Sequence, residues 1–416
     1  MSLKSRLIVL QFLQYFILGS WLLTIGAYWF QTKQWSGTEF GAIFSTIGLA
    51  SLFMPALAGV IADRWINAEK LLGFMHLGGA LTLLYVPQVD DPTLMFWVML
   101  LNMVFYTPTI SLSVSVSYST MKDAGMDVVK DYPPIRVWGT VGFIAALWTI
   151  SLSELEVSAT QFYVAAVASF LLAMFSFTLP KSPPLGKSIG GSWINNLGLQ
   201  GFTLFKNPSM ALFFMFVMLL GAALQITSAY SDTFLHDFAA IDAFKDAFAV
   251  KYPAVILSIS QISEALFILA VPFFMKRYGI KTVMLISLIA WTLRFGLFAY
   301  GDPGPGLWMI VLACIIYGVA FNFFHIAGSL FVETQVEPSM RSSAQGLFFM
   351  MANGFGAFFG SLASGIVIDK FFITDGVFDW PGIWMTFAGF VVVTALLFVV
   401  LFKDPDNRQD SDSFAK

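Results

Sequence analysis

The sequence predicts an all-α membrane protein, with twelve transmembrane helices in two six-helix bundles. Hydrophobic residues make up 58% of the 416 residues and charged residues only 11%, whereas a soluble domain usually carries about 25% charged residues. Apolar stretches of roughly 20 residues, the length that crosses a bilayer, recur along the whole chain. Seventeen of the 22 Lys and Arg residues fall on one side of the predicted membrane and four on the other, with Arg294 inside a span.

The twelve predicted spans begin with residues 7–32, which carry no charge. This stretch is longer than the ~7–15 apolar residues of a signal peptide, so we interpret it as an uncleaved membrane helix. Two other stretches, 252–275 and 282–301, are each interrupted by one charge, Glu264 and Arg294. The remaining nine stretches carry no charge and are 40–62, 71–89, 92–121, 137–153, 157–180, 207–231, 303–332, 342–368 and 380–402.

Lys and Arg accumulate on the cytoplasmic side of membrane proteins, so both termini are predicted to be cytoplasmic. The longest polar loop on that side, 181–206, is rich in Gly, Ser and Pro and follows the sixth span. We therefore expect an N-terminal bundle over 1–180, a linker over 181–206, a C-terminal bundle over 207–403 and a cytoplasmic tail over 404–416. Paired six-helix halves of this kind hold their substrate near mid-membrane, between the halves.

Polar side chains inside the apolar spans mark a candidate transport path, because a charge at mid-bilayer costs at least ~2.5–3.5 kcal/mol on insertion scales. Gln261 and Glu264 are three residues apart, so they share one helix face. A desolvated carboxyl group there can load and release a proton; the alternative is a structural acid bonded within the bundle. Gln225 and Ser228 have the same spacing one span earlier, where the alternative is a polar contact between helices.

Two further faces combine aromatic and polar side chains. Tyr317, Phe321 and His325 form a stripe at i, i+4 and i+8, with Asn322 beside it; packing is the alternative explanation for such a stripe. Arg136, Thr140 and Phe143 follow a Pro-Pro helix start at i, i+4 and i+7. The alternative for Arg136 is a charge that anchors the cytoplasmic end of its helix. Arg294 is expected to extend to the membrane surface or to pair with Asp302.

If these faces converge, the cavity offers amides, hydroxyls, aromatic rings, one acid and one guanidinium. That set suits a neutral solute with a flat ring and several hydroxyls, such as a nucleoside, and leaves a sugar or another polyol open. Bases stack on aromatic side chains with ~1–3 kcal/mol each in nucleic-acid sites.

The three His are scattered and no H-E-x-x-H pattern occurs, so we expect no enzyme, no metal and no cofactor. Cys314 is interpreted as packing.

The segment GVIADRWINAEK resembles the G-x-x-x-D-R motif of the major facilitator superfamily through Gly59, Asp63, Arg64 and Lys70. In that superfamily the acidic and basic residues pair across neighbouring helix ends and stabilise one conformational state. The resemblance implies the same for this segment; the alternative is that Arg64 and Lys70 only set the orientation in the membrane.

Long stretches such as FMPALAGVIADRW, AGMDVVKDYPPIRVWGTVGF, SISQISEALFIL and SAQGLFFMMANGFG resemble the nucleoside:proton symporter family of that superfamily, over almost the full length. The resemblance implies proton-driven import of nucleosides across the bacterial inner membrane, by a monomer in the lipid bilayer that binds no nucleic acid. The substrate-contacting positions of the family correspond here to Arg136, Thr140, Phe143, Gln225, Gln261, Glu264, Tyr317 and Phe321.

Three positions depart from the family pattern. Ser228 and His325 stand where the family often has Asn, and Asn322 stands where it often has Asp. We include Ser228 and Asn322 in the predicted substrate site and assign proton coupling to Glu264, which is left as the main intramembrane carboxylate. An uncoupled nucleoside facilitator is the alternative that the Asn322 departure raises.

Overall fold

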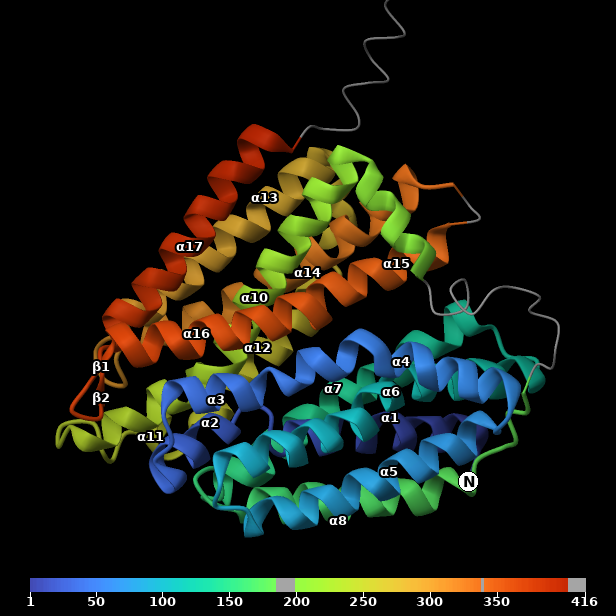
Figure 1. The fold of residues 1–416 in the computed structure, drawn as a ribbon, viewed down its shortest axis with the longest axis horizontal. Coiled ribbons are helices and arrows are strands. Elements are labelled where there is room, and N and C mark those ends of the chain that lie inside the picture. Colours follow the sequence, from blue (N-terminus) through green and yellow to red (C-terminus); the bar gives the residue numbers. More distant parts are fainter. Residues whose placement is uncertain (185–198, 338–339, 403–416) are drawn as a thin grey trace, which may run out of the picture.

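The structure, a computed structural model, describes residues 1–184, 199–337 and 340–402. Figure 1 shows two groups of helices lying against each other, one formed by the first half of the chain (blue to teal) and one by the second half (green to red). Most of the predicted linker, residues 185–198, and the whole predicted tail lie outside the described residues. Residues 199–206 of the predicted linker form a 3-10 helix, η3 (Leu199–Lys206).

Some helices of the first half begin at residues whose side chains cap the helix. The Ser36 side chain accepts a hydrogen bond from the Glu39 N–H, and the Glu39 carboxylate accepts one from the Ser36 N–H. These two bonds form a capping box. Asp91 caps the helix that begins at Pro92. The elements are α1 (Leu3–Gly19), α2 (Ile25–Ala27), η1 (Tyr28–Lys33), α3 (Gly37–Phe44), α4 (Thr46–Arg64), α5 (Ala68–Tyr85), η2 (Val86–Gln88), α6 (Pro92–Asp123), α7 (Val128–Leu152) and α8 (Thr160–Ser176).

The second half contains the remaining helices and one short hairpin, in which Ile373 pairs with Phe378 and Thr374 with Val377. After η3 its elements are α10 (Pro208–Asp237), η4 (Phe238–Ala240), α11 (Phe248–Lys251), α12 (Pro253–Phe267), α13 (Val271–Tyr300), α14 (Leu307–Gln335), α15 (Arg341–Phe349), η5 (Met350–Gly356), α16 (Ala357–Phe371), β1 (Ile373–Thr374), β2 (Val377–Phe378) and α17 (Trp380–Leu401).

Each of the twelve predicted apolar stretches contains helix. Within the described residues, nine helices are long and apolar enough to cross a membrane by length and composition alone. The other predicted spans contain the shorter helices α1, α8 and α12. The predicted eighth and ninth spans meet inside α13 at Gly279, whose φ of 72° is non-helical. Glycine is suited to this break because it has no Cβ to clash at positive φ.

The two groups of helices contact each other at one end of the molecule, where small residues allow close approach. The backbones of Gly41 in α3 and Gly365 in α16 lie against each other. Asp369 accepts hydrogen bonds from Thr38 Oγ1 (2.8 Å) and the Gly37 N–H (3.3 Å). The β1–β2 hairpin and α11 lie near this end, at the left in Figure 1, and α15 lies toward the opposite end.

The Gly59–Lys70 motif lies at the C-terminal end of α4 and the beginning of α5. In the part of the chain that the structure describes, Asp63, Arg64 and Lys70 form no ion pair within 4.0 Å. Asp63 instead lines a polar groove with Lys122. The pairing that the superfamily resemblance implies is therefore not formed in this conformation, and the conformational role of the motif stays a prediction.

Candidate substrate-binding site

A central cavity of about 280 Å³ lies between the two groups of helices. Ligand sites in proteins commonly measure about 300–1,000 Å³, so this cavity suits a compact small molecule. The structure brings nine of the ten predicted site residues together in its wall: Arg136, Thr140, Phe143, Gln225, Ser228, Gln261, Glu264, Tyr317 and Phe321.

The α7 side of the cavity is organised around Arg136. The predicted Pro-Pro helix start is wrong, because α7 begins at Val128 and both prolines, Pro133 and Pro134, lie inside it. The Arg136 guanidinium carbon lies 4.2 Å from the centre of the Tyr15 ring, a cation–π contact that holds the charged group beside the cavity. Thr140 and Phe143 follow at helical spacing and line the same cavity. This face therefore offers a cation, a hydroxyl and a ring to one ligand.

The second half of the chain contributes α10 and α12 to the cavity wall. Gln225 and Ser228 lie on one face of α10, and the Ser228 hydroxyl donates to the Leu224 carbonyl at 3.0 Å, which leaves its lone pairs available. Gln261 and Glu264 lie on one face of α12, so the acid and the Arg136 guanidinium line the same cavity from opposite halves of the chain. A ligand between them can accept hydrogen bonds from one half and donate to the other.

Asn322 is the predicted site residue that does not line the cavity. Its Nδ2 donates to the backbone carbonyl of Glu264 at 2.6 Å, and the residue is 4% exposed. It therefore lies behind Glu264 and connects α14 to α12.

The aromatic stripe on α14 forms a continuous stack. The Tyr317 and Phe321 rings are 5.8 Å apart and nearly parallel, and Phe321 stacks on the His325 ring at 4.3 Å. The first two rings line the cavity, whereas His325 extends the stack toward Phe348. The cavity thus has a flat apolar face on which a planar ring can stack.

The expectation for Arg294 is wrong. The residue is 2% exposed, and its guanidinium donates to the Ala313 carbonyl (2.6 Å), Thr227 Oγ1 (3.1 Å) and Ser260 Oγ (3.3 Å). Asp302 instead accepts from the backbone of a neighbouring glycine turn. A buried cation needs hydrogen-bond partners, and three helices supply them here.

Sequence reasoning missed other cavity residues: Tyr15, Tyr106, Thr107, Phe349 and Asn353. Tyr106 donates to the Gln14 carbonyl at 2.8 Å. Polar side chains within apolar spans were the available signal, because Thr107 and Asn353 meet the same criterion as Gln225. His76 and Asn102 form contacts between helices: His76 bonds to Gln14 at 2.9 Å and Asn102 to Thr82 at 2.8 Å.

The cavity continues toward one end of the molecule. A second cavity of about 640 Å³ shares Ser51, Thr107, Ile110 and Phe349 with the first. It extends past Pro55 of α4 and past Ser342 at the start of α15. The path therefore leads toward the ends of these helices that carry Arg64 and Arg341, whereas the opposite end is closed by the contacts of α3 with α16.

Comparisons with known proteins agree with this geometry. The model of the family described as "Nucleoside H+ symporter" matches residues 1–407. Xanthosine permease of Escherichia coli is 52% identical over 410 residues, which cover 98% of both chains. Nucleoside permease NupG of the same organism is 50% identical, over 97% of this chain and 96% of that one.

Solved structures give the same result. A crystal structure of nucleoside transporter NupG superimposes with a TM-score of 0.92 at 50% identity, over 97% of this chain and 100% of that one. PepTSo2 has a TM-score of 0.70 at 12% identity, over 98% of both chains, and has the same fold. The chain is a multi-pass bacterial inner-membrane transporter and not an enzyme, and it belongs to the nucleoside H+ symporter family.

Proposed function

We propose that this protein imports nucleosides together with protons by alternating access, from a central site between its two halves. The observation that carries the proposal is the cavity whose wall combines Arg136 and Glu264 with Gln225, Gln261 and the Tyr317–Phe321 stack. The names of the relatives, a xanthosine permease and a nucleoside permease, support the same substrate class.

The residues of the cavity have separate proposed roles. The base stacks on Phe321 and Tyr317, since each base presents a π-face to an aromatic platform. The ribose hydroxyls bond to the amides of Gln225 and Gln261 and to the Glu264 carboxyl group, with Ser228 and Thr140 as further hydroxyl partners. Arg136 orients the substrate from the α7 side, and Phe143 closes that side of the cavity.

Glu264 is the proposed coupling residue. It is the carboxyl group in the cavity wall, and both halves of the chain approach it there. Asn322 supports it indirectly, by holding the Glu264 backbone carbonyl. A membrane potential of 100 mV supplies about 2.3 kcal/mol per proton, enough for roughly fiftyfold accumulation of a neutral solute.

The proposed orientation has both termini in the cytoplasm, with bundles over 1–180 and 207–403 that are joined by the 181–206 linker and a tail over 404–416. The excess of Lys and Arg on the Arg64 side supports it. In this orientation the structure is inward-facing, because its cavity leads toward that side. We further propose that the protein works as a monomer in the lipid bilayer.

The test is uptake of radiolabelled uridine and adenosine into proteoliposomes, with and without an inward proton gradient. We expect gradient-stimulated accumulation that unlabelled nucleosides block and sugars do not. Equilibration without accumulation would identify an uncoupled facilitator instead. No uptake of either nucleoside by folded protein, together with uptake of a sugar, would contradict the proposed substrate class.

A further inference from the structure

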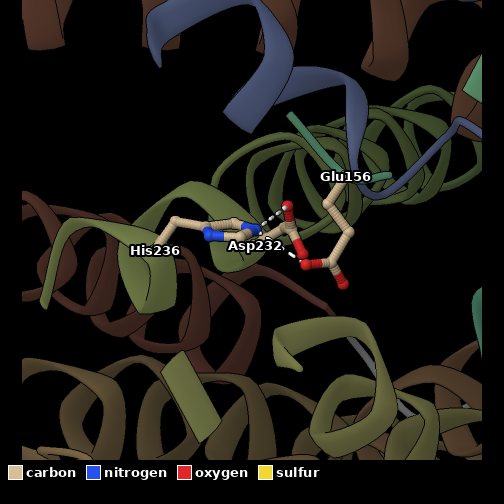
Figure 2. Close-up of side chains that lie close together, drawn as sticks. All are labelled: Glu156, Asp232 and His236. Atoms are coloured by element: carbon tan, nitrogen blue, oxygen red, sulfur yellow. Dashed lines mark ion pairs between the residues drawn. The ribbon is translucent and has the colours of Figure 1, made fainter. Parts of the chain in front are cut away.

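A second cluster of titratable side chains lies away from the central cavity, at the closed end of the molecule. Glu156 lies in the connection between α7 and α8, in the first half of the chain, whereas Asp232 and His236 are one turn apart on α10 in the second half. Figure 2 shows the His236 imidazole pointing at both carboxylates. We call these three residues the outer triad.

The contacts inside the outer triad cross the boundary between the two halves. His236 Nε2 lies 2.8 Å from Glu156 Oε2 and 3.7 Å from Asp232 Oδ2. The other Glu156 oxygen accepts the Ala254 N–H at 3.0 Å, at the start of α12. The triad therefore exists as a unit only while this end is closed, because separation of the halves removes Glu156 from its partners.

The charge of the outer triad does not balance without an additional proton. The Asp232 side chain is 0% exposed and the Glu156 side chain 2%. Two carboxylates and one imidazolium sum to one negative charge, and neither Asp232 oxygen accepts a hydrogen bond from the described residues. A buried charge without hydrogen-bond partners is strongly unfavourable, whereas a protonated carboxyl group carries no such charge.

Neighbouring charged groups do not neutralise the negative charge of the outer triad, because those at this end have partners of their own or are exposed. Asp237 accepts from Trp380 Nε1 at 2.8 Å and from Gln31 at 3.5 Å. Lys33 of η1 pairs with Asp90, and Lys251 of α11 pairs with Asp246 at 2.9 Å. Glu154, in the same connection as Glu156, is exposed.

We propose that the outer triad is a proton-binding latch: closure of the outer end traps one proton on Asp232, beyond the proton on His236. This inference rests on the proposed transport function and orientation. Because the closed state binds more protons than the open state, lowering the external pH favours closure. In the proposed orientation the trapped proton enters from outside and returns outside when the end reopens. It therefore shifts the equilibrium between the open and closed outer end but does not drive the substrate uphill, which distinguishes the outer triad from Glu264.

The experiment measures the opening of the outer end directly. Spin labels on Ser153→Cys and Ala243→Cys, two exposed positions on opposite halves, report the distance across it; the native Cys314 is buried and does not compete for the label. A Glu264→Gln background removes titration of the central carboxyl group. Without substrate, we expect the closed-to-open ratio to rise as pH falls from 7.5 to 5.5, by up to about tenfold per pH unit for one proton.

Asp232→Asn should reduce this pH dependence, because the closed triad is then neutral with only His236 protonated, so that closure binds one proton fewer. Asp246→Asn, which removes a carboxylate at the same end but outside the triad, should leave it unchanged. Persistence of the wild-type pH dependence in Asp232→Asn would overturn the latch. If Asp232→Asn does not yield folded protein, Glu156→Gln makes the same charge change and should give the same result.

Uptake separates the latch from the coupling site. With Glu264 intact, Asp232→Asn should still accumulate uridine against its gradient, since the trapped proton is not translocated. Loss of accumulation in folded Asp232→Asn protein would overturn the latch and make the triad part of the transported-proton path. If the pH response of the wild-type protein disappears after treatment with a chelator, the triad binds a metal ion and the proton-binding latch is overturned. The distance measurement needs no substrate, so it stands even if the proposed nucleoside uptake fails.

Discussion

At the residue scale, the proposed mechanism assigns proton coupling and substrate recognition to different side chains of the cavity. Glu264 and the Tyr317–Phe321 rings line the same space from α12 and α14. In the proposed mechanism, only Glu264 changes charge during a transport cycle. Substitution of Glu264 should therefore change proton coupling, whereas substitution of the Tyr317 or Phe321 ring should change the affinity for substrate.

Glu264→Gln should bind nucleoside but fail to concentrate it. The amide has the shape of the acid but carries no dissociable proton, so substrate movement is no longer linked to the gradient. Proteoliposomes should show equilibrative uptake and exchange, with no stimulation by an inward proton gradient. Uphill accumulation with a normal pH dependence in this variant would remove the coupling role from Glu264.

Phe321→Ala should weaken nucleoside binding by about 5- to 150-fold, because a base–aromatic stack contributes ~1–3 kcal/mol. Calorimetric titration of the purified variant with uridine measures the change in Kd. Phe359→Ala removes the same side chain from a position outside the cavity where the residue is 53% exposed, and should leave Kd unchanged. Equal affinities of the two variants would show that the base does not stack on α14.

At the element scale, the length of the apolar stretches was sufficient to predict the membrane helices, and the spacing of polar and aromatic residues was sufficient to bring nine predicted residues to the cavity wall. Gln261 and Glu264 share a face because of helix geometry alone. Spacing does not report which neighbouring helix a side chain meets. The contact of Asn322 with the Glu264 backbone and the internal bonds of Arg294 depend on helix packing, so they were not predictable. The same limit applies to His236, whose partner Glu156 comes from the other half of the chain.

The glycine contact between α3 and α16 gives a prediction at this scale. A Cβ at Gly41 would meet the Ser361 carbonyl and Gly365. Overpacking costs about 1–3 kcal/mol, so Gly41→Ala should shift the closed-to-open ratio of this end by about 5- to 150-fold toward open and slow uptake. The Ser153–Ala243 label pair measures the shift. Gly389→Ala, where a Cβ meets open space, is the control, and an equal response from both would contradict the packing argument.

At the scale of the whole molecule, the orientation in the membrane decides which end takes up the substrate. We expect Ala243→Cys to react with a membrane-impermeant maleimide in intact cells. Lys122→Cys, at the C-terminal end of α6, should react only after the membrane is opened. Both positions are exposed, and the native Cys314 is buried. Reaction of Lys122→Cys in intact cells would reverse the proposed orientation and the direction of the cavity.

The buried Arg294 guanidinium has a mechanical consequence for the second half of the chain. It extends from α13 and donates to groups on α10, α12 and α14, so one side chain bonds to three neighbouring helices. Sliding one of these helices past another would break a charge-assisted hydrogen bond of a buried cation, which is costly. This half should therefore resist elastic deformation. Free energy released when ligands bind is then expressed as rotation between two stiff bodies, rather than being dissipated in the bending of single helices.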